Sequence, residues 1–174
     1  AWADKGIKPP DSDYPTLQAG TLVPVDEARR ALPKIPGVTF PAAVNGPELL
    51  DFGPSFNSQG GSLTTLPPTI GAHYIIYVPK PNRDGLDIAG VHPIEIRVPT
   101  GTHTGRNVRK EGFRAPHMCP LTGWFIPFAA TMEQRVASGD PRKSLEERYG
   151  NHEGYVNAVR EQTKALVGER FLLE

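Results

Sequence analysis

The side chains best suited to chemistry lie between residues 98 and 116, in the stretch VPTGTHTGRNVRKEGFRAP. The imidazole of His103 can exchange protons near neutral pH, which makes this residue the candidate catalytic group. Guanidinium and ammonium groups can bind the carboxylate or phosphate of an anionic ligand. The candidate ligand-binding residues are Arg106, Asn107 and Arg109, with Lys110 and Arg114 as further cations.

A second interpretation of this stretch is a turn that follows a strand ending near Pro99. Threonine hydroxyls bond backbone groups in turns, Asn107 can bond its own backbone, and Gly101 and Gly105 are expected at positive φ. The cations can equally pair with acidic groups on a neighbouring surface. We favour this structural interpretation, because a general base needs a nucleophile and a partner acid, and the sequence offers neither.

The other patterns that could carry chemistry are weaker. No G-x-S-x-G nucleophile elbow occurs, and residues 53 to 62, GPSFNSQGGS, are expected to form a flexible loop rather than a phosphate-binding loop. Cys119 stands alone, so it is either a nucleophile or a small buried apolar residue, and we favour the second. The histidines share no helical i, i+4 spacing, so we predict no metal site and no cofactor. They are His73, His92, His103, His117 and His152.

Composition limits the class of protein. The 174 residues include 19 prolines and 18 glycines, and only 38% are hydrophobic. This length suits one domain or a large piece of a bigger one. The net charge is zero, which argues against nucleic acid or an anionic membrane as the main partner. No apolar run is long enough to span a membrane.

The elements that must position these side chains fall into two halves, which together predict a mixed α+β fold. The first half is expected to hold the end of a helix at residues 1 to 6, then a proline-rich extended arm with a short helix at 25 to 32. Residues 72 to 78 and 90 to 98 have the composition and alternation of strands. With the Asp84-Gly85 turn between them, they predict a β-hairpin that packs on or extends a sheet.

The second half is predicted to be helical. Thr131 and Gln134 form one capping box, and the helix that follows is expected to stop at Gly139. Ser144 and Glu147 form a second capping box, and Asn151 caps a third, longer helix. The chain thus divides into an arm at 1–70, a hairpin with connecting loops at 71–130, and a helical segment at 131–174.

Four stretches together resemble one family. They are TGRN at 104–107, IPF at 126–128, SGDPR at 138–142 and ERY at 147–149. In this combination the chain resembles the C-terminal part of large bacterial proteins that contain an α/β-hydrolase domain of unassigned substrate, and the likeness covers nearly its whole length. The chain departs from that family's pattern at Arg106, where the family typically has tryptophan. The family position that matches His103 is not always histidine.

The resemblance implies an esterase-like serine hydrolase whose nucleophile, acid and catalytic histidine lie upstream of Ala1. The chain would then be a C-terminal segment of an α/β fold that supplies scaffold and a pocket wall. Its partner would be the N-terminal hydrolase portion or a companion chain, and its substrate a small-molecule ester. The family usually continues past Glu174 as well. Similar proteins are often exported, but the sequence shows no signal peptide, so the compartment stays open.

Two further hypotheses remain beside this one. The chain could be a non-catalytic binding or assembly subunit. It could also be an independent enzyme that uses His103 and the neighbouring cations on an anionic substrate.

Overall fold

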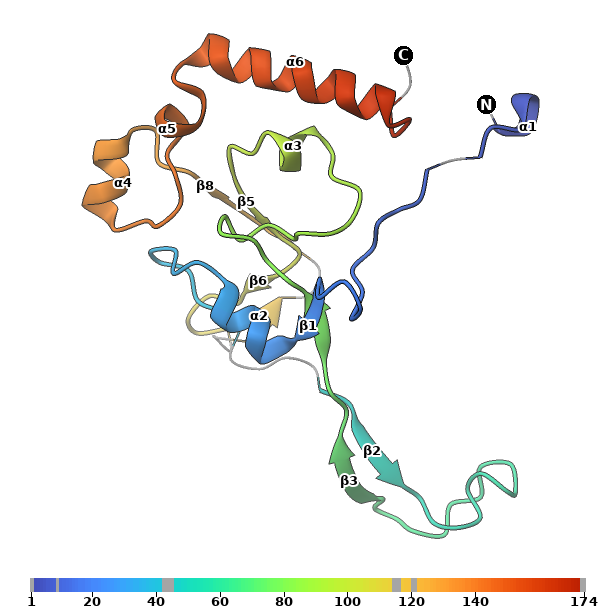
Figure 1. Cartoon of the computed structure of the whole chain (residues 1–174). Coiled ribbons are helices and arrows are strands. Elements are labelled where there is room, and N and C mark those ends of the chain that lie inside the picture. Colours follow the sequence, from blue (N-terminus) through green and yellow to red (C-terminus); the bar gives the residue numbers. More distant parts are fainter. Residues whose placement is uncertain (1, 9, 42–45, 114–116, 120–121, 173–174) are drawn as a thin grey trace.

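The computed structural model describes residues 2–8, 10–41, 46–113, 117–119 and 122–172. Within these residues the fold is mixed α+β, with four separate two-stranded antiparallel sheets (Figure 1). The elements in chain order are α1 (Trp2–Lys5), β1 (Leu22–Pro24), α2 (Val25–Ala31), β2 (Glu48–Asp51), β3 (Thr69–His73), β4 (Tyr77–Pro79), α3 (Ile94–Arg97), β5 (Gly101–Thr104), β6 (Asn107–Val108), β7 (Met118–Cys119), β8 (Trp124–Pro127), α4 (Met132–Ser138), α5 (Leu145–Tyr149) and α6 (His152–Gly168).

The three helices predicted on the C-terminal side are confirmed, and Thr131, Ser144 and Asn151 cap them. The capping box predicted at Thr131 forms only in part, because the Gln134 side chain accepts from the Ala130 backbone N–H at 3.1 Å and not from that of Thr131. The Thr131 hydroxyl accepts a hydrogen bond from the Gln134 backbone N–H at 3.2 Å. Ser144 opens α5 with a complete capping box, and the Asn151 side chain accepts from the backbone N–H of Gly154 at 2.9 Å. The side chains of Thr131, Ser144 and Asn151 cap their helices as predicted because each accepts from a backbone N–H only three residues along the chain.

The predicted β-hairpin between residues 72–78 and 90–98 is wrong. The first segment divides between β3 and β4, which pair with β2 and β1 of the proline-rich arm. Residues 94 to 97 form the helical turn α3 instead of a strand, with Pro93 at φ −68° as its N-cap. Proline fixes a φ that suits the start of a helix, so residues 94 to 97 are not available as a strand, and β3 and β4 pair with strands of the arm instead.

The predicted Asp84-Gly85 turn does form, although it closes only a local loop. Gly85 has a φ of +78°, and its N–H donates to the Asn82 carbonyl oxygen at 3.0 Å. An isolated bridge joins Pro81 to Asp87 just outside this turn. The loop brings Asp84 to Arg148 of α5, with which it forms an ion pair.

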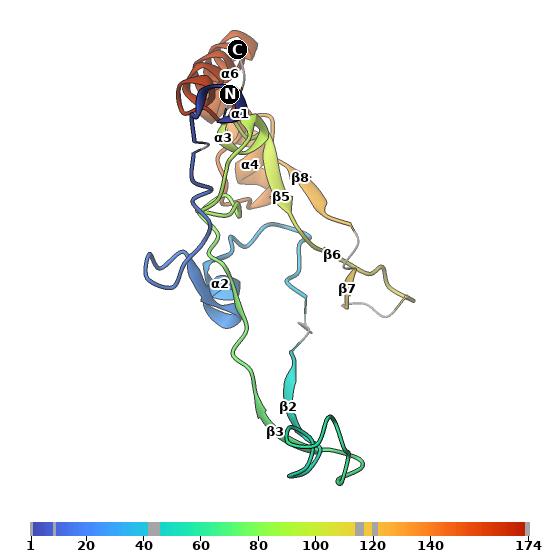
Figure 2. The ribbon, with the colours of Figure 1, turned by 90° about the vertical axis from the view of Figure 1, so that its right-hand side faces the viewer.

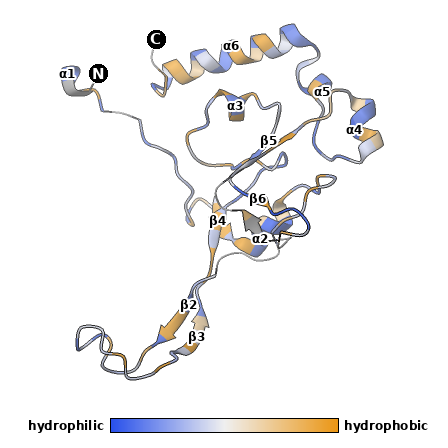
Figure 3. Ribbon diagram, turned by 180° about the vertical axis from the view of Figure 1, so that it is seen from behind, coloured by the Kyte–Doolittle hydropathy of each residue, from blue (hydrophilic) through white to orange (hydrophobic). Residues whose placement is uncertain are grey.

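The proline-rich arm has a packed part and a protruding part. Strand β1 and helix α2 lie against β4, whereas β2 and β3 form a ribbon that extends away from the body (Figures 1 and 2). Every residue of β3 is exposed, and Leu50 of β2 and Ile70 of β3 are 44% and 61% exposed. Apolar residues therefore lie along a ribbon that no described part of the chain covers (Figure 3).

The core includes residues of β5 and β8 and the underside of α6. Its buried apolar residues are Val23, Ala28, Ile35, Leu86, Val98, Ile126, Phe128 and Leu166. Helix α6 runs over α3, where Arg97 forms an ion pair with Glu169 at the end of α6. In the part of the chain that the structure describes, no helix is long and apolar enough to cross a membrane.

Candidate functional site

A cavity of about 320 Å³ lies where α2, β4, the turn at Gly85 and β5 meet. Its charged or titratable side chains are Asp87, His103 and Arg106. Most of the remaining wall is apolar and comes from α2, β4, Phe40 and several prolines. A concave, mostly apolar cavity with a few converging polar groups is the usual form of a small-molecule site.

Strand β5 places His103 at this cavity. It pairs with β8 in antiparallel register, so that His103 lies opposite Phe125, and the centroids of the two rings are 4.8 Å apart. Alternation along the strand directs Thr102 into the core, where it is fully buried, and leaves His103 exposed. The stretch that was expected to follow a strand therefore contains the strand itself.

Arg106 lies against an aromatic ring at the cavity wall. Its guanidinium carbon is 4.2 Å from the centroid of the Phe40 ring, and that of Arg29 is 4.9 Å from the same centroid. Burial lowers the pKa of Arg106, and the nearby charge of Asp87 opposes this. Burial likewise raises the pKa of Asp87, against the opposing charges of Arg106 and His92. Arg106 is half-buried whereas Asp87 is an exposed residue, so the wall of the cavity carries two opposite charges of which Arg106 is the less exposed.

The other two predicted ligand-binding residues lie elsewhere. Asn107 accepts a hydrogen bond from the Val108 backbone N–H at 2.8 Å, and it lines a separate void of about 10 Å³, which has room for one water at most. The exposed Arg109 donates its backbone N–H to the His117 carbonyl oxygen at 2.9 Å. The structure thus brings His103 and Arg106 together at the cavity and leaves Asn107 and Arg109 outside it.

The explanation predicted for the two glycines is wrong, since neither Gly101 nor Gly105 has a positive φ. Gly101 is required for a different reason. A Cβ at this position would lie 2.5 Å from the carbonyl oxygen of Ile126 and 2.6 Å from the Phe125 ring. The close approach of β5 to β8 therefore excludes a side chain there.

Asp87 and Phe40 are the site residues that sequence reasoning missed. Phe40 follows α2 in the arm, while Asp87 follows the turn at Gly85. Neither residue belongs to a motif, and no spacing links them to the stretch at 98–116. The available signal was the turn itself, which predicts a loop but not the direction in which that loop runs.

A buried polar cluster, the Arg142 cluster, joins β5 and β8 to the loop between α4 and α5. Arg142 is 3% exposed, and its guanidinium pairs with the Asp140 carboxylate at 2.6 Å. The same guanidinium donates to the Thr102 hydroxyl at 2.8 Å and to the carbonyl oxygens of Ile126 and Pro127 at 3.0 and 3.1 Å. Every buried polar atom named here has a partner, as a stable buried network requires.

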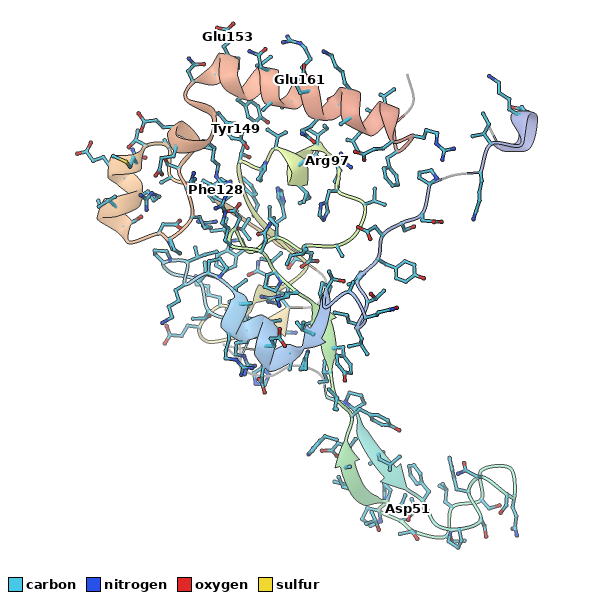
Figure 4. All side chains as sticks on the ribbon, in the orientation of Figure 1. Asp51, Arg97, Phe128, Tyr149, Glu153 and Glu161 are labelled. Carbon is cyan, nitrogen blue, oxygen red and sulfur yellow. The ribbon has the colours of Figure 1, made fainter. Side chains whose placement is uncertain are left out.

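The Arg142 cluster continues into α5. The Thr102 hydroxyl donates to the Asp84 carbonyl oxygen, and the Asp84 carboxylate pairs with Arg148, whose guanidinium carbon is 4.1 Å from the Phe128 ring centroid. Phe128 and Tyr149 lie on the side of the molecule that carries the C-terminal helices, far from the protruding ribbon (Figure 4). Three of the stretches that carry the family resemblance, at 126–128, 138–142 and 147–149, therefore meet in the scaffold.

A second cavity, of about 440 Å³, lies between the start of β5 and helices α5 and α6. Several of its polar groups already bond within the protein. The Tyr149 hydroxyl donates to the Pro99 carbonyl oxygen at 2.8 Å, the Glu146 carboxylate accepts from the Met132 backbone N–H, and Asn151 caps α6. We therefore place the candidate site at the first cavity, where the Arg106 guanidinium forms no hydrogen bond with another described residue.

His73, His92 and Cys119 lie at separate places in the structure. No group of three or more His, Cys, Asp or Glu side chains in the described ranges could hold a metal ion. His73 lies on the ribbon beside Glu48, at 3.5 Å, whereas His92 lies just before α3. Cys119 is half-buried rather than buried as predicted, and its sulfur accepts a hydrogen bond from the Thr122 hydroxyl at 3.5 Å.

Comparison with known proteins assigns the chain to a family. The family model described as an alpha/beta hydrolase domain matches residues 1–174. The chain therefore belongs to the alpha/beta hydrolase domain family, as its motifs predicted. No curated protein and no solved structure matches it.

Proposed function

We propose that the chain is the C-terminal segment of an esterase-like serine hydrolase, in which it supplies scaffold and part of the wall of the substrate pocket. The observation that carries this proposal is a family match to an alpha/beta hydrolase domain over the whole chain. Under this proposal the nucleophile, the acid and the catalytic histidine are supplied from upstream of Ala1. The substrate is a small-molecule ester.

The chemistry of ester hydrolysis supports a location of the catalytic residues outside this chain. A serine hydrolase needs an activated nucleophile, a base that takes its proton and donors for the oxyanion. The sequence has no G-x-S-x-G elbow, and the described residues that line the cavity include no serine or cysteine. His103 and Arg106 can bind or orient a substrate, but neither supplies the hydroxyl or thiol that a serine or cysteine hydrolase acylates.

The test compares this chain with the longer protein that carries it. Hydrolysis of p-nitrophenyl butyrate should not exceed the buffer rate for the chain alone, whereas the protein with the hydrolase portion should turn it over. A fluorophosphonate probe should label a serine upstream of this chain and none within it. Turnover by the chain alone that disappears in His103→Ala would overturn the proposal and favour an independent enzyme.

The second candidate is a non-catalytic binding or assembly subunit. The observation that favours it is the ribbon of β2 and β3, which exposes Leu50 and Ile70 to solvent. Exposed apolar surface of this kind is typical of a contact with another protein. The two candidates differ in the intact mass of the purified protein and in the sequence of any chain that co-purifies. A folded, stable monomer of this chain alone would contradict the first candidate.

A further inference from the structure

We propose that the cavity binds a small ligand through a single carboxylate, that Arg106 binds this carboxylate, and that the apolar body of the ligand lies against α2 and β4. The inference rests on the proposed function only in treating this cavity as part of a ligand pocket. It adds the chemical class of the ligand, and it needs no catalytic step.

The first argument is that Arg106 differs from the other arginines that are not exposed. Four such residues each form an ion pair with a carboxylate: Arg97, Arg135, Arg142 and Arg148. Arg106 is half-buried as well, yet in the described ranges its guanidinium donates no hydrogen bond and forms no ion pair. Its donors face the cavity without an acceptor among the described residues, so a ligand that supplies acceptors there can form charge-assisted hydrogen bonds with them.

The second argument concerns the position of the guanidinium. Its carbon lies over the Phe40 ring, 4.2 Å from the ring centroid. The N–H donors of a guanidinium all lie in one plane and form a rigid fork. A carboxylate fits two such donors at once, in the bidentate arrangement that makes Arg–carboxylate pairs strong.

The third argument concerns the charge of the ligand. Asp87 lies at the same cavity, and it influences Arg106 electrostatically without forming an ion pair with it in the described structure. Its carboxylate repels any anion that approaches, and the repulsion grows with the charge of the ligand. A monoanion such as a carboxylate is therefore favoured over a dianion such as a phosphate monoester.

The fourth argument concerns size and polarity. The volume of about 320 Å³ is at the lower end of the range for small-molecule sites, roughly 300–1,000 Å³. Val25, Ala28 and Leu32 of the α2 side and Val78 of β4 form an apolar wall. An alkyl or aryl group of modest size would bury apolar surface there while its carboxylate meets Arg106.

The experiment measures binding of hexanoate and of its neutral counterpart hexanamide, by calorimetry, to the protein as isolated. Three variants are compared: Arg106→Met, Asp87→Asn and the matched control Arg109→Met, whose arginine lies nearby but outside the cavity. Hexanoate should bind Arg106→Met at least about tenfold more weakly, because the charged bidentate contact is lost. It should bind Asp87→Asn more tightly, because the repulsion is removed.

Hexanamide should bind weakly and about equally to all forms, and Arg109→Met should behave as the unaltered protein. Opposite effects of two neighbouring substitutions are hard to obtain from a general loss of structure. If Arg106→Met does not fold, Arg106→Lys keeps the charge without the planar fork and should lose part of the hexanoate affinity.

The proposal is overturned if hexanamide binds as well as hexanoate, if Arg106→Met leaves hexanoate affinity unchanged, or if Arg109→Met weakens it equally. A weaker affinity of Asp87→Asn for hexanoate would also overturn it, since Asp87 would then help to bind the ligand. These outcomes are independent of hydrolysis. Failure of the esterase test leaves the carboxylate site standing, and failure of the binding test leaves the esterase proposal standing.

Discussion

Replacement of Arg142 by methionine tests whether the Arg142 cluster holds the fold together. The substitution leaves the Asp140 carboxylate, which is 9% exposed, without its counter-charge. It also removes the donors to Thr102 and to the Ile126 and Pro127 carbonyl oxygens. Breaking a buried ion pair on one side costs about 3–5 kcal/mol. A domain is stable by only about 5–15 kcal/mol, so Arg142→Met should lose a large share of the free energy of unfolding.

The assay is urea unfolding, followed by far-UV circular dichroism, at neutral pH. The control is Arg160→Met, because Arg160 lies on the exposed side of α6 and bonds only to Asn157 in the described structure. The double variant Asp140→Asn with Arg142→Met should lose less than the sum of the single variants, because no buried charge is then left unpaired. A loss below about 1 kcal/mol for Arg142→Met, equal to that of the control, would refute the reasoning.

Three further predictions concern the C-terminal helices. Gly154→Ala should destabilise the protein by about 1–3 kcal/mol, because its Cβ would lie 1.9 Å from the Tyr149 carbonyl oxygen. A Cβ at Gly168 would meet open space, so Gly168→Ala should stabilise the protein by up to about 1 kcal/mol. The two variants are compared by urea unfolding, and changes of the same sign in their free energies of unfolding would contradict this. The pKa of Glu147 lies at about 2, held down first by the hydrogen bond from the Ser144 backbone N–H. The stabilisation that the ionised Glu147 carboxylate gives the folded state is present above its ordinary pKa of 4.5 and is lost as the pH falls toward about 2. Glu147→Gln should therefore flatten the pH dependence of the urea midpoint in that window. An unchanged slope would count against a lowered pKa for Glu147.

The helical half of the chain could be predicted from sequence because its determinants are local. The hydroxyl of Ser144 and the backbone N–H of Glu147 are three residues apart, so the cap can be identified without knowledge of the rest of the fold. The same local reasoning misjudges Gly154, which a propensity scale treats as a weak point of α6. The approach of the Tyr149 carbonyl oxygen, which the sequence does not reveal, makes this glycine necessary.

The strands could not be predicted in the same way, because pairing depends on segments that are distant in sequence. Residues near 77 have the composition of a strand, but their partner Val23 lies in the arm, where prolines hide any periodic signal. The candidate site shows the same difference between local and distant residues. His103 and Arg106 could be predicted together because they are close in sequence, whereas Phe40 and Asp87 reach the cavity only through the folding of two loops.

The location of the family motifs separates what the family determines from what this chain adds. The stretches at 126–128 and 138–142 lie in the Arg142 cluster, where their polar groups bond one another. They therefore specify a scaffold and not a reaction. Arg106 lies at the cavity instead, at a position where the family that the chain resembles typically has tryptophan. An indole and a guanidinium are both planar and can both pack on the Phe40 ring, but only the guanidinium carries a charge and several donors. An arginine at this position therefore gives the cavity a positive charge that a tryptophan would not supply.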